Sequence, residues 1–259
     1  MANETIIYDK LNGVATITLN RPQALNAFVP QMNKEVLEAL RDGERDKEVR
    51  CFMITGAGRA FCAGQDLKGR TPEQKGSLGA SLREKYNPMI RQIRAMEKIV
   101  IAAVNGVAAG AGCNFALACD LRVASEEAKF IQSFVRVGLA PDSGGSFILT
   151  RLVGLSKAME LLLLGDTVDA KEAQRIGLLN HLVPCAQLRQ KTMELGTMIA
   201  TNRHDAVMGV KALLIEDMGR NLEEQWANER RYTTDVIRGA KAETAFPEFI
   251  ARRGRRLPS

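Results

Sequence analysis

The sequence predicts an α/β protein built on one large core, and three observations indicate this class. A short apolar run that ends in a glycine-rich loop occurs twice, in VRCFMITGAG at 49–58 and in IVIAAVNGVAAGAG at 99–112. Such runs are typical of buried parallel strands. Residues 5–20 have the pattern of a β-hairpin, and the chain from residue 155 onward is mostly helical in pattern. Together these segments predict helices packed on a sheet.

The hairpin is predicted from two β-rich runs on either side of Asn12-Gly13, a dipeptide that favours tight turns. In the second run Ala15, Ile17 and Leu19 alternate with threonines, as in a strand with one buried face. We therefore expect two paired strands over residues 5–20.

Helices are predicted from apolar residues at helical spacing. One is expected over residues 32–46, after Pro22 ends the strand pattern, with Gly43 near its end. Another is expected around residues 79–97. Asp169 is expected to cap the helix that begins AKEAQRIG.

The chain is expected to divide into a core of residues 1–200 and a helical region of residues 201–259. Leu222 and Trp226 are the expected apolar anchors of that second region. No low-complexity tract or linker separates the two parts, so we treat the second as an appendage of a single α/β core.

Composition limits the classes of protein. The chain has 259 residues, of which 46% are hydrophobic and 25% charged, as in ordinary globular proteins. No stretch approaches the roughly 20 apolar residues of a membrane helix, and the N-terminus lacks a signal-peptide pattern, so a soluble cytoplasmic protein without membrane contacts is expected. Five scattered cysteines and two histidines predict neither disulfides nor a metal site.

The net charge of +6 is concentrated in the tail ARRGRR at 251–256. This run has no interleaved aromatic residues and no recognised nucleic-acid-binding module around it. A solvated tail or contacts with the phosphates of a small anionic ligand are therefore favoured over nucleic acid.

Two glycine-rich loops follow apolar strands, FCAGQDL at 61–67 and NGVAAGAGCN at 105–114. Glycine-rich turns allow backbone N–H groups to face a ligand without side chains in the way. Neither has the pattern of a P-loop or of a dinucleotide-binding loop. Backbone donors at a helix N-terminus suit an oxyanion. Tight strand-to-helix packing is the alternative reason for these glycines.

Asp142 lies in RVGLAPDSGG, where a loop gives way to a helix. It is either a helix cap, which would accept N–H bonds from the following helix, or a catalytic base. The local sequence allows both interpretations.

The chain resembles the crotonase, or enoyl-CoA hydratase/isomerase, superfamily. The likeness runs in order through GVATITLNRPQALNAF, FCAGQDL, IAAVNGVAAGAG, ALACDLRVASEEAKF, GLAPDSGG and GDTVDAKEAQRIGLLNHLVP. It implies a spiral of ββα units, a C-terminal helical trimerisation region and an acyl-CoA thioester substrate. It also implies a homotrimer or a hexamer of paired trimers, and no cofactor, because coenzyme A is part of the substrate.

The resemblance also implies the site residues. The backbone N–H groups of Gln65 and Ala111 would form an oxyanion hole for the thioester oxygen, where one donor is typically worth about 2.7 to 4 kcal/mol. Asp142 would be the catalytic carboxylate. Substrate-binding positions are implied at Gln23, Ala24, Leu25, Ala63, Gly64, Asp66, Leu67, Gly110 and Phe134. Phe130 is a second candidate for an apolar wall beside Asp142.

The hydratases of this family use two glutamates around one water, and this chain has Asn114 and Phe134 at those positions. Neither side chain can exchange a proton, although Asn114 has the alternative of binding nearby backbone. The Asp142 position resembles the catalytic aspartate of dienoyl-CoA isomerases, 4-chlorobenzoyl-CoA dehalogenases and 1,2-epoxyphenylacetyl-CoA isomerases.

The closest likeness is to the last of these, through SLREKYNP, VAAGAG, AKFIQSF and GLAPDSGG. The segment IQSFVRVG lacks the histidine and tryptophan of a dehalogenase, and Phe134 replaces the second acid of dienoyl isomerases. The leading hypothesis is an acyl-CoA isomerase with a single aspartate base, acting on an epoxyphenylacetyl-CoA or by a Δ3-to-Δ2 double-bond shift. Alternatives are an enoyl-CoA hydratase or dehydratase, and a catalytically silent acyl-CoA-binding protein.

Overall fold

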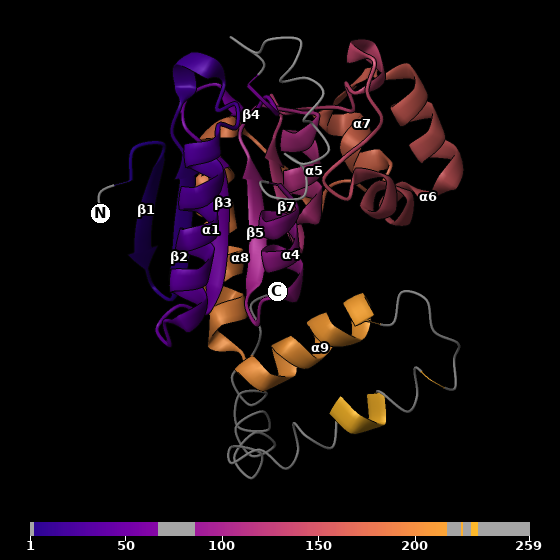
Figure 1. Ribbon diagram of the computed structural model, residues 1–259. Helices are drawn as coiled ribbons and strands as arrows, with labels where there is room; N and C mark the ends of the chain where they lie inside the picture. Colours follow the sequence, from indigo (N-terminus) through magenta and orange to yellow (C-terminus); the bar gives the residue numbers. More distant parts are fainter. Residues whose placement is uncertain (1–2, 67–85, 217–223, 225–228, 233–259) are drawn as a thin grey trace. The chain divides into compact units, whose positions relative to one another are not determined.

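The computed structural model describes residues 3–66, 86–216, 224 and 229–232 (Figure 1). The chain forms two compact units, residues 1–201 and 202–259, and each is described by itself. Leu222, Trp226 and the arginine-rich tail lie outside the described residues.

The first unit contains a six-stranded sheet in the order β1-β2-β3-β5-β7-β10. β1 and β2 are antiparallel and the other neighbours are parallel. The predicted hairpin is confirmed: its turn residues Asn12 and Gly13 have φ values of 51° and 75°. The strands are β1 (Ile6–Leu11), β2 (Val14–Leu19), β3 (Cys51–Gly56), β5 (Ile99–Val104), β7 (Leu121–Ser125) and β10 (His181–Val183).

A second, four-stranded sheet has the order β4-β6-β8-β9. β4, β6 and β8 are parallel, and β9 is antiparallel to β8. Its strands are β4 (Ala60–Cys62), β6 (Val107–Ala109), β8 (Lys129–Ile131) and β9 (Thr167–Asp169). The run at 99–112 therefore forms two strands in different sheets rather than one strand and a loop. The chain turns between them at Gly106, where a Cβ atom would lie 2.1 Å from the Arg59 carbonyl oxygen.

The chain repeatedly adds one strand to the large sheet, one to the small sheet and then a helix, as in β5-β6-α5 and β7-β8-α6. This confirms the expected spiral of ββα units. The helices of the first unit are α1 (Pro30–Arg45), α4 (Asn87–Ala95), α5 (Ala111–Ala118), α6 (Gly145–Leu164), α7 (Ala170–Arg175) and α8 (Leu188–Thr201). Short 3-10 helices are η1 (Pro22–Ala24), η3 (Val135–Val137) and η4 (Cys185–Gln187), and the second unit contains α9 (His204–Glu216).

The predicted helix at 32–46 is α1, and α4 covers part of the range expected near 79–97. The cap at Asp169 is confirmed, because its carboxylate accepts the Glu172 N–H at 2.8 Å. Among the helices in the described ranges, none combines the length and apolar character required to cross a bilayer.

Helices cover both faces of the large sheet: α1 and α4 lie on one face and α8 on the other (Figure 1). Successive residues of a strand point to opposite faces. Phe52 of β3 points to α1, since a Cβ atom at Gly43 would lie 2.5 Å from its ring. Cys51 points to α8, where a Cβ atom at Gly196 would lie 3.7 Å from its sulfur. Both faces of the sheet are therefore buried at β3.

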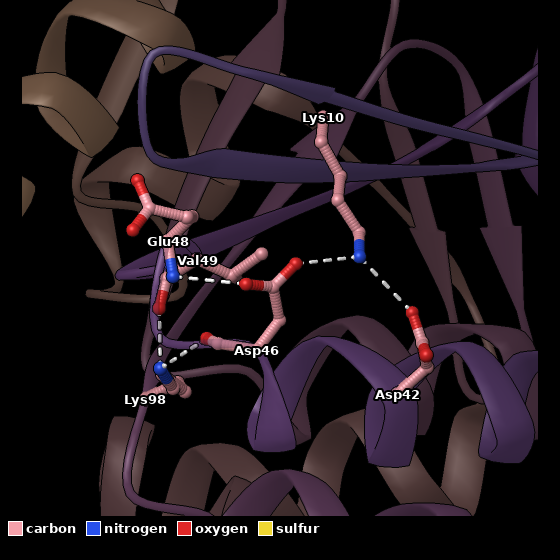
Figure 2. Close-up of polar contacts among 6 residues, drawn as sticks. All are labelled: Lys10, Asp42, Asp46, Glu48, Val49 and Lys98. Atoms are coloured by element: carbon pink, nitrogen blue, oxygen red, sulfur yellow. Dashed lines mark hydrogen bonds and ion pairs between the residues drawn. The ribbon is translucent and has the colours of Figure 1, made fainter.

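A polar network ties α1 to the large sheet (Figure 2). Lys10 of β1 donates to Asp42 at 3.1 Å and to Asp46 at 2.7 Å. Lys98, which precedes β5 and is 6% exposed, donates to the carbonyl oxygens of Asp46 and Val49. Burial lowers the pKa of Lys98, because the charged ammonium group is less well solvated there than in water. The hydrogen bonds to the two carbonyl groups offset part of this desolvation cost.

Lys98→Met is expected to lower the free energy of unfolding by about 1–3 kcal/mol, because it removes the donor from the buried carbonyl group of Val49 and the partly buried one of Asp46. The urea midpoint at fixed protein concentration measures this. Lys10→Met is the control, because its exposed ion pairs are expected to contribute less. Equal losses in the two variants would contradict the prediction.

Candidate active site

Three parallel strands of the small sheet end at the same edge, and each delivers a segment singled out in the sequence. β4 leads into residues 63–66, β6 into residues 110–111 and β8 into residues 132–134. Ligands of open α/β sheets bind beyond the carboxyl ends of the strands. This edge is therefore the candidate site.

Two glycines bring the first two segments into contact. Gly64 has a φ of 88°, and a Cβ atom on it would lie 2.7 Å from the Ala109 carbonyl oxygen and 3.4 Å from the Ala111 nitrogen. Gly110 has φ 52° and ψ −125°, a backbone conformation that only glycine adopts readily. A side chain at Gly64 would push the segment at 63–66 away from the start of α5.

The backbone geometry orients both predicted oxyanion donors. Phe28 donates to the Gly64 carbonyl oxygen at 2.7 Å and accepts from the Asp66 N–H at 3.0 Å. In such a parallel bridge the N–H of the intervening residue, Gln65, points away from Phe28. Ala111 is the first residue of α5, so its N–H has no acceptor within the helix and lies at the positive end of the helix dipole.

A pocket of about 520 Å³ adjoins the segment at 63–66. It is lined by most of the positions predicted to bind substrate. It is also lined by Arg59, a basic residue that was not predicted from the sequence. The lining residues are Gln23, Ala24, Leu25, Ala27, Arg59, Ala63, Gln65 and Asp66. Leu67 lies outside the described residues, and Gly64, Gly110 and Phe134 lie at the strand edge rather than in this lining.

The loop at 21–28, which forms one wall of the pocket, is organised by the buried side chain of Asn26. Its amide donates to the carbonyl oxygens of Ala57 at 2.9 Å and Ala60 at 2.8 Å, and its oxygen accepts the Arg21 N–H at 2.9 Å. Arg21 also forms an ion pair with Asp66 at 3.0 Å. These contacts join the pocket wall to β4.

Asp142 does not cap α6 with its side chain. The N-cap residue is Gly144, without a side-chain cap bond, and the Gly145 N–H donates at 2.8 Å to the main-chain oxygen of Asp142. Among the described residues, the Asp142 carboxylate accepts one hydrogen bond, from Ser143 Oγ at 2.8 Å. The cap interpretation is therefore wrong, and the carboxylate remains available for other chemistry.

Burial raises the pKa of Asp142 above its usual value, and the hydrogen bond from Ser143 partly offsets this. Ser143 is buried and has a φ of 53°, which is uncommon for a residue with a side chain. A half-buried carboxylate with a raised pKa on a strained turn is typical of functional sites.

The structure separates the two phenylalanines proposed as an apolar wall. A Cβ atom at Gly110 would lie 3.9 Å from the ring of Phe134, so this ring lies beside the strand edge. Phe130 instead lines a small interior cavity of about 10 Å³ with Leu117 and Leu149. Phe130 therefore belongs to the hydrophobic core.

The cysteines nearest the site are unsuited to nucleophilic chemistry. Burial raises the pKa of Cys62 and of Cys113 to about 12, so both remain neutral thiols near neutral pH. Within the described part of the chain, no group of three or more His, Cys, Asp or Glu side chains is placed to bind a metal ion. The groups left for chemistry are therefore carboxylates and backbone donors, and of the carboxylates Asp66 is paired with Arg21.

The chain is similar to one family along almost its whole length. A family model described as enoyl-CoA hydratase/isomerase matches residues 9–256. A 1,2-epoxyphenylacetyl-CoA isomerase of Escherichia coli (strain K12) is 38% identical, with 96% of this chain and 97% of that protein covered. A short-chain-enoyl-CoA hydratase of Clostridium acetobutylicum is 35% identical, with 98% of this chain and 97% of that protein covered.

Solved structures agree with this likeness. The crystal structure of an enoyl-CoA hydratase from Bacillus anthracis has a TM-score of 0.89 and 30% identity, and covers 99% of this chain and 98% of its own. The structure of Pseudomonas aeruginosa DspI has a TM-score of 0.90 and 28% identity, and covers 96% of this chain and 94% of its own. The chain thus shares its fold with these proteins over nearly its whole length.

Proposed function

Because this chain belongs to the enoyl-CoA hydratase/isomerase family, we propose that it is an acyl-CoA isomerase that acts through a thioester enolate with Asp142 as its single base. The observation that carries this proposal is the half-buried Asp142 carboxylate, which does not cap α6 and which lies on a turn hydrogen-bonded to Asn114 of α5. The two hydratase carboxylate positions are occupied by Asn114, whose amide is engaged in the interior, and by the apolar Phe134.

In the proposed reaction Asp142 removes a proton from the carbon next to the thioester carbonyl, and the electron pair passes to the thioester oxygen. The N–H groups of Gln65 and Ala111 stabilise the resulting enolate oxygen. The proton then returns at another carbon of the conjugated system, so that a double bond has moved and no atom is gained or lost. Phe134 keeps water from the intermediate.

A single base could isomerise either of two acyl groups, a 3-enoyl chain or the epoxide of a phenylacetyl thioester. With the epoxide, proton abstraction opens the three-membered ring toward the expanded oxepin. The 38% identity to a protein named 1,2-epoxyphenylacetyl-CoA isomerase supports the second substrate. We also propose a homotrimer or hexamer, supported by exposed apolar residues on α6 such as Leu155 and Leu163.

The proposed function is tested with the wild-type protein in deuterated water. Phenylacetyl-CoA and a 3-enoyl-CoA are followed by NMR for exchange of the α proton, and the products of the 3-enoyl and epoxide thioesters are identified. An isomerase exchanges the proton and forms isomers. Hydration of crotonyl-CoA without isomer formation would instead support a hydratase, and binding without exchange or turnover would support a silent acyl-CoA-binding protein.

Arg59→Ala is expected to raise KM for acyl-CoA about fivefold, equivalent to about 1 kcal/mol, and to leave kcat unchanged. Arg59 lines the pocket and is exposed, and a guanidinium there suits a phosphate of coenzyme A. Steady-state kinetics at two salt concentrations measure the effect. Arg175→Ala, which removes an exposed arginine paired with Glu172 on α7, is the control. An unchanged KM in the Arg59 variant would contradict the phosphate contact.

A further inference from the structure

We propose that Asn114 is a positioning residue that holds the turn carrying Asp142 against the first turns of α5. This inference rests on the proposed function, because it concerns the base of that reaction. It explains why an amide occupies a position where the family's hydratases have a glutamate.

The side-chain amide of Asn114 is fully buried and joins three parts of the chain. Its Nδ2 atom donates to the main-chain oxygen of Asp142 at 2.8 Å. Its Oδ1 atom accepts from Gln132 Nε2 at 2.9 Å, and Gln132 follows β8. A residue of α5 thus ties the end of β8 to the turn that precedes α6.

The start of α6 also packs directly on this amide. A Cβ atom at Gly145 would lie 2.2 Å from Asn114 Nδ2 and 2.5 Å from its Cγ atom. Such contacts are too close for any side chain, so glycine at this position lets the helix start reach the asparagine. The asparagine therefore fixes the turn through both a hydrogen bond and contact packing.

An amide suits this place because it donates and accepts at the same time. A carboxylate could accept from Gln132 but could not donate to the Asp142 carbonyl oxygen unless it were protonated. It would also place a second negative charge near the proposed base. An aliphatic side chain would leave the buried Gln132 amide without this acceptor.

The turn needs such support because it is strained. Ser143 has a φ of 53° and Gly144 a φ of 75°, and the Asp142 side chain itself is held by one hydrogen bond. A catalytic group displaced by 1 Å can lose about 10²-fold in rate. Loosening the turn is therefore expected to affect kcat rather than substrate binding.

The test compares Asn114→Leu, Asn114→Asp and Asp142→Asn by α-proton exchange, kcat and KM over a range of pH. Asn114→Leu is expected to lower kcat about 10²-fold with KM changed by less than about twofold. In Asn114→Asp the new group donates only when protonated, so its activity relative to wild type is expected to fall as pH rises. Asn33→Leu, which removes another buried asparagine, on α1, is the control and is expected to retain activity.

The outcomes separate this inference from the proposed function. If Asp142→Asn loses exchange while Asn114→Leu keeps a kcat near that of wild type, the positioning role is overturned and the function stands. If Asp142→Asn retains exchange, both are overturned. If Asn114→Leu fails to fold, the pH profile of Asn114→Asp decides, and a profile with the shape of the wild-type profile overturns the positioning role.

Discussion

Asp142→Asn is expected to lower kcat by about 10²–10⁴-fold, the usual contribution of a general base, while KM for acyl-CoA stays nearly unchanged. Asparagine has the size of aspartate, and the turn is bonded through the main-chain oxygen of residue 142, which the substitution keeps. The loss should therefore report the missing base. Steady-state kinetics and α-proton exchange in deuterated water measure it. Exchange at the wild-type rate in the variant would show that another group takes the proton.

The pH dependence identifies Asp142 independently. A base acts in its ionised form, so activity is expected to fall as pH decreases through the pKa of Asp142, which burial raises above its usual value. The hydrogen bond from Ser143 stabilises the carboxylate and lowers this pKa. Ser143→Ala should therefore move the acidic limb of kcat/KM to higher pH. An unchanged limb in this variant would contradict the assignment.

The same raised pKa predicts that Asp142→Asn is the more stable protein at neutral pH. A carboxyl group whose pKa is higher in the folded state favours folding while it is protonated, and this contribution is lost as pH rises through the folded-state pKa. At neutral pH the ionised Asp142 therefore opposes folding. A melting temperature at or above that of wild type would show that the loss of activity does not come from unfolding.

Local signals explain how much of the fold could be predicted. The Asn12-Gly13 turn, the spacing in α1 and the cap at Asp169 each depend on residues a few positions apart. The small sheet was not predicted as a separate sheet because its strands have three residues each, too few to show a period. The break at Gly106 depends on its approach to Arg59, which lies far from it in sequence.

In the candidate site, too, the features that depend on short motifs could be predicted, and those that depend on long-range packing could not. The predicted backbone donors and the QAL loop were found from short motifs that this chain shares with a known family. Arg59 was missed because its place in the pocket depends on the packing of β4 beside the loop at 21–28. The bond from Asn114 to Asp142 spans 28 positions. Only the folded chain shows that Asp142 leaves α6 uncapped.

Gly64→Ala is expected to lower kcat by about 10²–10³-fold, the effect of losing one oxyanion donor. The new Cβ atom would lie 2.7 Å from the Ala109 carbonyl oxygen, at a φ of 88° that alanine rarely adopts. The segment at 63–66 must then move away from α5, which separates the Gln65 N–H from the Ala111 N–H. Single-turnover isomerisation and enolate-dependent proton exchange measure the loss.

The strain of a positive φ also lowers stability by about 1–3 kcal/mol, so the kinetic loss needs a matched control. Gly13→Ala is suitable, because Gly13 has a φ of 75° in the turn between β1 and β2 and its Cβ atom would meet nothing closer than 3.5 Å. This control should lose stability but keep kcat. If Gly64→Ala also keeps kcat, the Gln65 N–H does not stabilise the transition state, and the oxyanion must be held by Ala111 with a different partner. A loss of kcat in Gly64→Ala alone would instead tie the chemistry to the contact of Gly64 with residues 109–111.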